Sequence, residues 1–203
     1  LWVHTLNNKG TTTWTGTNDI SIANSSAFNN LAGALFEIQN DRAINNAQYG
    51  GSVNNSGTLR KTSATGTTTI AGGIGVSNSG SVEALSGTLN FVGGYTQSAG
   101  SLTLNGGNVQ ANGTFAVNGG SLSGVGTVTA NVSNSGQINP GNGGAGTLAI
   151  VGTYTQAASG TLNRIVASGL TAPRTPAWAG VSVNSALMSG SMMPTERLTS
   201  IAA

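Results

Sequence analysis

The sequence predicts an all-β protein folded as a parallel β-solenoid. Three observations support this class: a short internal repeat, turn residues at matching intervals and an almost uncharged composition. Only 12 of the 203 residues are charged, which is 6% against roughly 25% in a typical soluble domain. Glycine contributes 32 residues, so neutral amides, hydroxyls and backbone groups supply most of the polarity. This composition argues against an ordinary helical enzyme.

The repeat is a triplet of Gly, then Thr or Ser, then an apolar residue. Copies begin at Gly87, Gly100, Gly113 and Gly126, at a constant interval of thirteen positions. A further small or apolar residue follows two positions later, and such alternation predicts strands with one side chain inward and the next outward. Whether this interval is one small coil or part of a larger coil stays open. The apolar members of the triplets are expected to form a buried stack along the axis: Leu89, Leu102, Phe115, Val128, Leu148 and Leu162.

Turn residues keep the same interval. The segments 105–107 and 118–120 both read Asn-Gly-Gly, and Asn131 follows Asn118 at the same spacing. Asn and Gly tolerate positive φ, so they can turn the chain sharply between strands. Recurrent Asn side chains could also form amide ladders, in which each amide bonds to the next along the stack. A β-sandwich with many turns is the alternative, but a sandwich requires no fixed interval.

A longer duplication overlies the short repeat. The segment Val76–Gly80 (Val-Ser-Asn-Ser-Gly) recurs unchanged as Val132–Gly136. Phe91–Gln97 recurs in similar form as Ile150–Gln156, at an offset three positions longer, and residues 53–57 form a weaker copy of the first segment. These matches predict that the solenoid extends toward the N-terminus in degenerate form.

The repeats divide the chain into three segments. Residues 1–75 are expected to form degenerate solenoid coils, and residues 76–163 to form regular repeats. Residues 164–203 hold three of the four prolines and all three methionines, and are expected to be an irregular or disordered tail. Two interpretations of the tail stay open: a frameshifted continuation of the coding sequence, or a native flexible segment.

Several kinds of chemistry are excluded by residue type. The chain has no Cys and a single His, His4, which removes disulfides, thiolate zinc sites and imidazole metal sites. Charges of residues 1–163 sum to zero, so no basic stripe for nucleic acid is expected. Residues 141–146 match the dinucleotide pattern GxGxxG, but a strand follows where that motif requires a helix. Residues 84–163 contain no Asp or Glu, which excludes repeat-borne calcium. No catalytic, cofactor-binding or metal-ligating residue is predicted.

Acid chemistry, if present, would depend on Glu37 and Asp41, with Asp19 and Glu83 as further candidates. In a helix Glu37 and Asp41 would share one face, and two carboxylates about 5 to 10 Å apart can cleave glycosidic bonds. The alternative is a solvated pair balanced by Arg42. On that interpretation, changing both residues to their amides should leave folding nearly unchanged, because neither has an obvious buried partner.

Two kinds of residue could bind sugars or ice. The Thr-rich segments 11–13 and 65–69 would need one outward Thr per coil to form a flat binding face, whereas the Thr residues are bunched in sequence. Tyr95 and Tyr154 occupy equivalent repeat positions, which indicates packing. The aromatic residues that could stack on sugar rings are Trp2, Trp14, Tyr49, Tyr95 and Tyr154.

Residues 119–141, followed by residues 146–156, resemble the β-strand repeat of bacterial autotransporter passenger domains. The resemblance is close over residues 76–163, loose over 1–75 and absent after 163. It implies a right-handed parallel β-helix that is exported by type V secretion and is displayed on the bacterial surface or released. It also implies a C-terminal membrane β-barrel in the same polypeptide, whose strand pattern is not visible in this sequence.

The resemblance implies a function only at the level of the family, because passenger domains include adhesins, proteases and toxins on one scaffold. We expect a structural stalk or adhesin scaffold with a role in virulence, and not an enzyme. Its expected partners are host or environmental glycans or surface proteins. The alternatives are a polysaccharide-active β-helix enzyme that uses the acidic residues near 37–41, and a glycan- or ice-binding surface.

Overall fold

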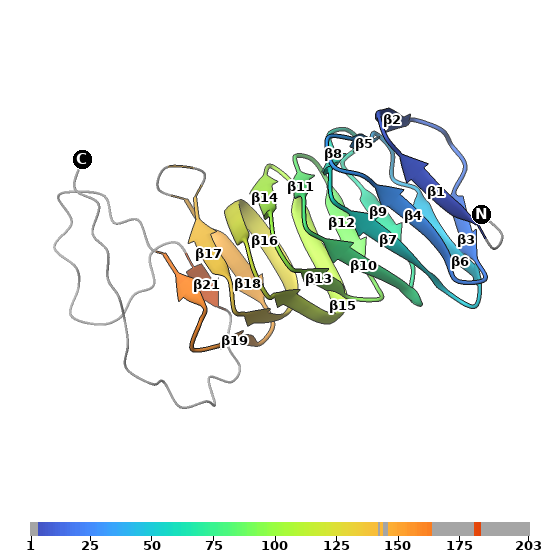
Figure 1. Cartoon of the computed structure of the whole chain (residues 1–203). Coiled ribbons are helices and arrows are strands. Elements are labelled where there is room, and N and C mark those ends of the chain that lie inside the picture. Colours follow the sequence, from blue (N-terminus) through green and yellow to red (C-terminus); the bar gives the residue numbers. More distant parts are fainter. Residues whose placement is uncertain (1–3, 142, 144–145, 164–180, 184–203) are drawn as a thin grey trace, which may run out of the picture.

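The structure is a computed structural model that describes residues 4–141, 143, 146–163 and 181–183. The described residues form 21 β-strands and no helix, and the pairings between these strands are parallel. Strands from successive turns of the chain lie side by side along one axis (Figure 1). The described chain is therefore a β-solenoid of about seven complete turns followed by strands of an eighth, as the repeat predicts, and not a β-sandwich.

Each turn of the solenoid contains three strand segments, which we assign to a first, a second and a third face in the order in which the chain reaches them. Short turns rich in Gly and Asn join the faces. At the corner from the third to the first face, Gly73 and Gly94 have φ angles of 80° and 93°, a left-handed conformation that costs glycine nothing sterically. The first face consists of β1 (Thr5–Asn8), β4 (Ser26–Asn30), β7 (Gly51–Asn55), β10 (Ile74–Asn78), β13 (Tyr95–Gln97), the end of β15 (Asn108–Val117), the end of β16 (Ser121–Asn134) and β19 (Tyr154–Gln156).

The other two faces are built in the same way from the remaining strands. The second face consists of β2 (Thr11–Trp14), β5 (Leu35–Ile38), β8 (Thr58–Lys61), β11 (Ser81–Ala84), β14 (Ser101–Asn105), the start of β16, β17 (Gln137–Pro140) and β20 (Thr161–Leu162). The third face consists of β3 (Ile20–Ala23), β6 (Ala43–Gln48), β9 (Thr67–Ile70), β12 (Thr88–Phe91), the start of β15, the middle of β16, β18 (Leu148–Val151) and β21 (Val181–Val183).

The interval of the short repeat is not one coil. Ser121 pairs with Gln137, and Ile44 pairs with Ile70, so the coils vary in length and each is longer than the repeat. One strand and its turn take up six or seven residues in the regular region, so the repeat interval covers two of the three strands in a coil. Two consecutive copies of the repeat therefore lie on different faces.

This geometry corrects the predicted inward stack. Leu89, Leu102, Phe115 and Val128 are all fully buried, as expected. However, Leu89 lies on the third face, Leu102 on the second and Phe115 on the first, and they stack on other residues. Leu89, for example, pairs with Thr68 and Val109.

The longer duplication does follow the coils. The register carries Val76 to Tyr95, then to Phe115 and then to Val132, so the offset between the identical segments spans three coils. Tyr95 reaches Tyr154 by the same route, also in three coils, which explains the slightly longer offset of the second duplicated segment.

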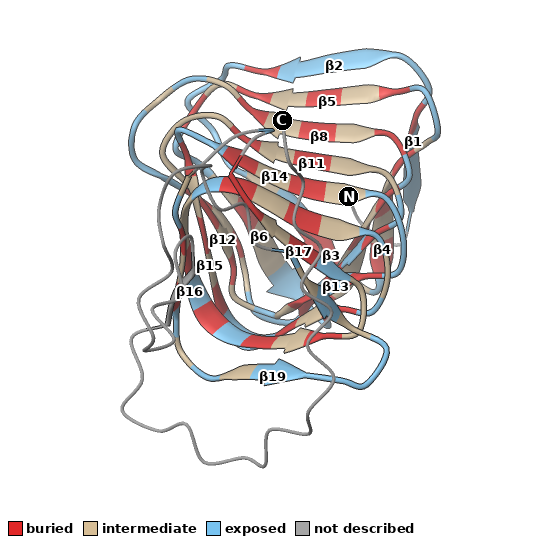
Figure 2. Ribbon diagram, turned by 90° about the vertical axis from the view of Figure 1, so that its left-hand side faces the viewer, coloured by how far each residue is buried: buried red, intermediate tan, exposed pale blue. Residues whose placement is uncertain are grey.

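Buried residues alternate with less buried ones along the strands (Figure 2), so alternate side chains point inward, where they form one continuous apolar core. Burying one Leu or Phe contributes roughly 1.5 to 3 kcal/mol, so every coil adds its own stabilisation and contacts mainly its neighbours. On the second face the inward row runs through Phe36, Leu59, Val82, Leu102, Leu122 and Ile138, all at most 1% exposed.

A buried amide ladder lies at the end of the first face. Asn30 donates from Nδ2 to Asn55 Oδ1 at 2.7 Å, and Asn55 donates to Asn78 Oδ1 at 2.7 Å. Each of these amides also bonds a backbone carbonyl at the start of the second face in the next coil, for example Asn55 to Ser81 O at 2.8 Å. The predicted ladder therefore exists, but at strand ends rather than at Asn105, Asn118 and Asn131. Its positions are Asn8, Asn30, Asn55, Asn78, Gln97, Val117, Asn134 and Gln156.

The structure bears differently on the two predicted boundaries, at residue 75 and at residue 163. β10 (Ile74–Asn78) crosses the boundary at residue 75 and pairs with β7 before it and β13 after it. Most of the expected tail lies outside the described residues. Its described part, β21, pairs in parallel with β18 on the third face.

Candidate functional site

The acidic residues Glu37 and Glu83 lie on the outer side of the second face, on either side of Arg60. The three residues occupy matching positions of β5, β8 and β11, so their charges alternate from coil to coil. Arg60 Nε lies 2.6 Å from Glu83 Oε2. The hydrogen bond to Glu83, together with the negative charges of Glu83 and Glu37, raises the pKa of Arg60 against the opposing effect of desolvation. This row is an inter-coil ion pair with a second carboxylate beside it.

Asp41 lies in the turn after β5, where it contacts Lys61. Lys61 is fully buried, at an inward position of β8 that Ile38 and Ala84 occupy on the neighbouring coils. Its Nζ atom lies 2.8 Å from Asp41 Oδ1 and 2.8 Å from Asn40 O. Burying an ammonium group is costly unless it is paired and hydrogen-bonded, and these contacts supply both requirements.

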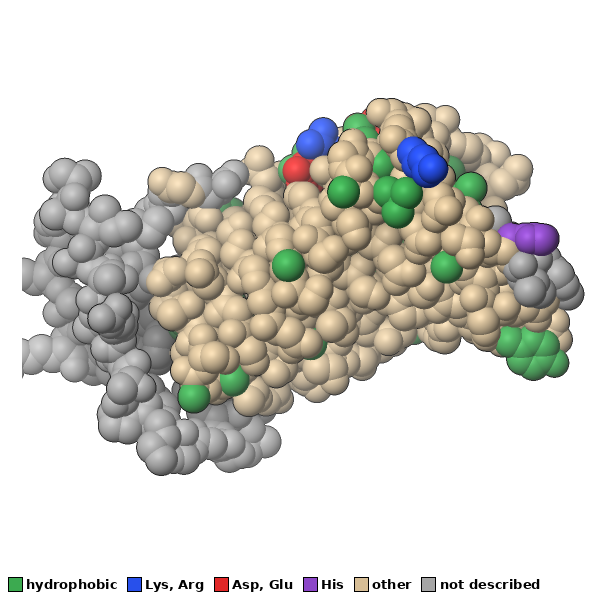
Figure 3. All heavy atoms as spheres, in the orientation of Figure 1, with side chains coloured by type: hydrophobic (Ala, Val, Ile, Leu, Met, Phe, Trp, Pro, Cys, Tyr) green, Lys and Arg blue, Asp and Glu red, His purple; other side chains and the backbone are tan. Residues whose placement is uncertain are grey.

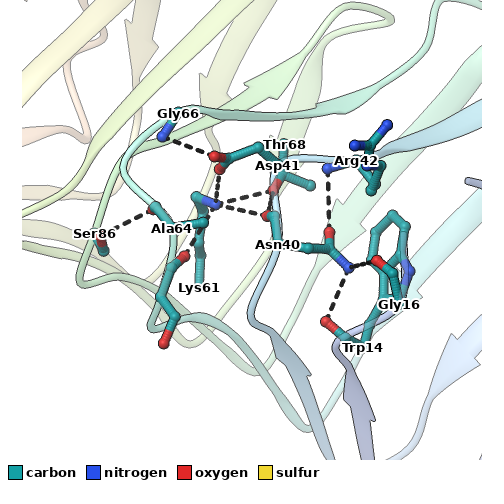
Figure 4. A network of polar contacts seen from close by, with 11 residues as sticks. Trp14, Gly16, Asn40, Asp41, Arg42, Lys61, Ala64, Gly66, Thr68 and Ser86 are labelled. Carbon is teal, nitrogen blue, oxygen red and sulfur yellow. Dashed lines mark hydrogen bonds and ion pairs between the residues drawn. The ribbon is translucent and has the colours of Figure 1, made fainter. Parts of the chain in front are cut away.

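Further polar groups close the network around Lys61 (Figure 4). Thr68 Oγ1 donates to Asn40 O at 2.6 Å and lies 3.1 Å from Lys61 Nζ. Asp41 Oδ2 accepts a hydrogen bond from the Gly66 amide at 3.0 Å. Asn40 Nδ2 donates to the carbonyl of Trp14 at 2.9 Å, one coil earlier. The network therefore joins three successive coils at the corner between the second and third faces.

This arrangement corrects one point in each of the two interpretations of Glu37 and Asp41. Glu37 and Asp41 are not on a helix: Glu37 points outward from a strand and Asp41 lies in the following turn. Asp41 pairs with Lys61 rather than with Arg42. The expectation that amides at both positions leave folding unchanged was based on the lack of a buried partner, which is wrong for Asp41.

Asp19 also has a role in coil stacking. It accepts hydrogen bonds from the Ala43 amide at 3.0 Å and from Asn45 Nδ2 at 2.8 Å, both one coil later. The backbone hydrogen bond from Ala43 is the main reason that the pKa of Asp19 is lowered. Among the described carboxylates, Asp19, Asp41 and Glu83 thus contact neighbouring coils, and Glu37 accepts from Gln39 at 3.0 Å.

No structural or functional role was predicted for Lys61 from the sequence. Alternation over Thr58–Lys61 puts Lys61 on the same side as Leu59, which was a usable signal. An inward Lys in an otherwise apolar row needs a counter-ion, and Asp41 lies 20 residues earlier in the sequence.

The aromatic candidates are mostly part of the core. Tyr95 is 1% exposed and lies between Phe91 and Phe115, with ring centroids 4.9 and 4.6 Å away. Trp14 is buried and stacks on Phe36, and burial raises the pKa values of both Tyr95 and half-buried Tyr154. Trp2 lies outside the described residues.

Tyr49 is the aromatic candidate that projects into solvent, with 76% of its surface exposed. Its φ angle is 56°, in the left-handed region that bulky residues rarely adopt. It lies at the corner from the third to the first face, where Asn24 stands one coil earlier with a φ angle of 52°. Its ring is therefore free to contact a ligand.

The threonine segments are less bunched than their sequence indicates. In β9, Thr68 points into the core, whereas Thr67 and Thr69 point outward. The outward row that contains Thr67 continues through Thr88 and Asn108 on the next two coils. One small polar side chain per coil is therefore present, but Asn interrupts the Thr row, so the face is not a uniform Thr lattice.

The C-terminal coils have a surface without formal charge. Residues 84–163 contain no Asp, Glu, Lys, Arg or His. In Figure 3 the charged side chains gather over the N-terminal coils, and most of the remaining visible surface is neutral. Outward positions there are occupied by small polar residues, such as Ser101, Thr103, Ser121 and Ser123 on the second face.

No protein-family model, curated protein or solved structure significantly matches this chain. Within the described ranges, no cluster of three or more His, Asp or Glu residues could hold a metal ion. The part of the chain that the structure describes also has no helix that could cross a membrane.

Proposed function

We propose that this β-solenoid is an adhesive scaffold of a secreted or surface-displayed protein, and that its neutral faces bind glycans. The observation that carries the proposal is the uncharged surface of residues 84–163, with rows of hydroxyl and amide side chains in register from coil to coil. Sugar hydroxyls can exchange hydrogen bonds with such groups, and no charged side chain has to be desolvated on contact.

The stacking of the coils supports a stalk. Each described coil is bonded to the next through parallel backbone pairing and one continuous core, and the amide ladder adds side-chain hydrogen bonds between the coils from Asn8 to Gln97. Contacts of this kind are nearest-neighbour, so a solenoid can extend without a change in its design. The resemblance of residues 76–163 to autotransporter passenger repeats supports export and display by type V secretion.

The contacts of the acidic residues favour the scaffold over a polysaccharide-cleaving enzyme. Asp41 is the counter-ion of buried Lys61, and Glu83 is paired with Arg60. Among the carboxylates of the described residues, Glu37 has the fewest side-chain hydrogen bonds, because its single one comes from Gln39 two positions away. It is therefore the proper residue with which to test the enzyme alternative.

The experiment measures binding and turnover on the same polysaccharides. The 203-residue protein is incubated with insoluble neutral polysaccharides, such as cellulose and chitin, at low and at high salt. We expect binding that salt leaves nearly unchanged, because screening weakens only interactions between charges. Failure to bind any neutral polysaccharide, or binding that high salt abolishes, would contradict the proposal.

Turnover is followed as the release of reducing ends or unsaturated uronates, for the wild type and for Glu37→Gln. General acid-base assistance contributes about 10² to 10⁴-fold to a rate, so an enzyme that uses Glu37 would lose activity to that extent. Release of products by the wild type that disappears in Glu37→Gln would replace the scaffold with the enzyme. We expect no release from either protein.

A further inference from the structure

The first face has a shallow hollow of about 510 Å³ near its corner with the third face. The hollow spans β7, β10, β13 and β15, and small residues line it: Ser52, Gly75, Ser77, Gly94, Thr96 and Thr114. Its volume lies within the range of about 300 to 1,000 Å³ that is usual for small-molecule sites. None of the described residues that line it is charged.

The hollow exists because Gly75 has no side chain, and ordinary structural reasons for a glycine are missing there. Gly75 lies inside β10 and does not have a positive φ angle. A Cβ atom at Gly75 would have no atom within 4 Å, so no close contact requires glycine. At neighbouring Gly94, by contrast, φ is 93° and a Cβ atom would lie 3.2 Å from Thr114 O.

Among the strand glycines in the described residues, Gly75 alone combines an unstrained backbone with open space at Cβ. Glycine within a strand destabilises the fold relative to alanine. It often marks a place where a ligand approaches the backbone closely. Gly75 is exposed at the middle of the hollow, which makes a ligand contact a physical reason for its presence.

The groups around Gly75 define the chemistry of the ligand. The hydroxyls of Thr96 and Thr114 are exposed and have no hydrogen-bond partner within the described part of the chain. Ser77 Oγ donates to Asn54 Oδ1 at 3.1 Å, which leaves its lone pairs free to accept. A ligand with several hydroxyl groups and no charge fits these donors and acceptors, whereas an ion would find no counter-charge.

We infer that the hollow over Gly75 is a binding subsite for one sugar ring of a neutral oligosaccharide. The ring would lie against the β10 backbone at Gly75 and exchange hydrogen bonds with Ser77, Thr96 and Thr114. This inference rests on the proposed glycan-binding function. It assigns that function to the place on the first face where residues 84–163 meet the equally uncharged strands β7 and β10.

The test compares Gly75→Val with Ala43→Val. Valine at residue 75 fills the hollow, and it suits an exposed strand position with free space at Cβ, so the variant should be at least as stable as the wild type. Ala43 points outward from β6 on the third face, where the same new side chain lies outside both the hollow and residues 84–163. Thermal unfolding of both variants is measured to check that the fold is retained.

Binding of cellohexaose, chitohexaose and maltohexaose is measured by isothermal titration calorimetry on the full chain. We expect Gly75→Val to weaken the binding of the sugar, raising its dissociation constant by about tenfold or more, and Ala43→Val to leave it unchanged. If the wild type binds and Gly75→Val binds equally well, the subsite is wrong while the proposed function stands. If the wild type binds none of these sugars and no neutral polysaccharide, the proposed function fails and the subsite with it.

Discussion

Val117 precedes Asn134 by one coil in the amide ladder of the first face, and it leaves Asn134 Oδ1 without a hydrogen-bond donor. At the other end of the ladder, Asn30 and Asn55 each donate to the next amide along the stack. Asn134 still donates from Nδ2 to Thr161 O at 3.1 Å. The ladder is thus interrupted at one apolar position, and the interruption produces a buried unsatisfied oxygen.

We predict that Val117→Asn is tolerated, although it places an amide at a fully buried position. The new Nδ2 group can donate to Asn134 Oδ1, and its second hydrogen can reach the Gln137 carbonyl, the equivalent of Ser81 O for Asn55. The free energy of unfolding, measured by urea denaturation, should change by no more than about 1 kcal/mol.

Val128→Asn is the matched control, because Val128 is equally buried but stands in an apolar row of the third face. Its amide would have no ladder partner, and the variant should lose about 3 kcal/mol or more. Equal losses in the two variants would show that the ladder does not determine where a buried amide is tolerated.

The second prediction concerns the buried Lys61. Asp41→Ala removes its counter-ion and should lower the free energy of unfolding by about 2 kcal/mol, between the values for exposed and for fully buried pairs. The intermediate value follows because the Asp41 side chain is 37% exposed whereas Lys61 is 0% exposed. Adding Lys61→Met to Asp41→Ala should restore most of the loss, since an apolar side chain suits this row of the core.

Glu83→Gln serves as the comparison for Lys61, because it breaks the more exposed pair with Arg60. It should cost less than about 1 kcal/mol. If Asp41→Ala proved as mild as Glu83→Gln, the buried network would not be a clamp between coils.

The third prediction concerns alkaline unfolding. Burial raises the pKa of Tyr95 above that of an unfolded tyrosine, which is about 10. The unfolded chain therefore releases this proton at a lower pH than the folded chain. The stability from Tyr95 is fully present below about pH 10 and is lost as the pH rises further, by at most about 1.4 kcal/mol per pH unit.

Tyr95→Phe should reduce the slope of stability against pH above pH 10, as followed by urea denaturation at several pH values. Tyr154→Phe should reduce it less, because Tyr154 is only half-buried. Identical slopes for the wild type and Tyr95→Phe would show that the phenol is not held in its neutral form by the core.

The fold class could be predicted from the sequence because the residue types mark both the turns and the strands. Gly and Asn at regular intervals, with alternating residues between them, allow few architectures other than a solenoid. The coil could not be predicted from the interval of the short repeat, because two strands of a three-strand coil repeat as regularly as a whole coil would. The identical segments at Val76 and Val132 carried the correct information, since their offset spans three coils.

The side-chain contacts were less predictable than the strands. Glu37 and Asp41 are close in sequence, and their spacing indicated a pair, but the pairs that form lie 20 and 23 residues apart, at Asp41 with Lys61 and Arg60 with Glu83. Stacked coils bring together residues one coil apart, so sequence neighbours are a poor guide to ion pairs. The interval between coils varies, and the partner of each charge is therefore set by the local turn lengths.

Oxidative cross-linking of paired cysteines tests the three-strand coil most directly, because the chain has no natural cysteine to interfere. Asn54 and Ser77 are register partners on adjacent strands of the first face, so their Cα atoms are expected to be about 4.8 Å apart, within disulfide range. Thr103 and Ala116 are separated by the interval of the short repeat but lie on the second and first faces. We predict a disulfide in Asn54→Cys with Ser77→Cys and none in Thr103→Cys with Ala116→Cys. A disulfide in the second pair and none in the first would contradict the three-strand coil. It would also contradict the register that aligns the polar side chains of the proposed glycan-binding surface.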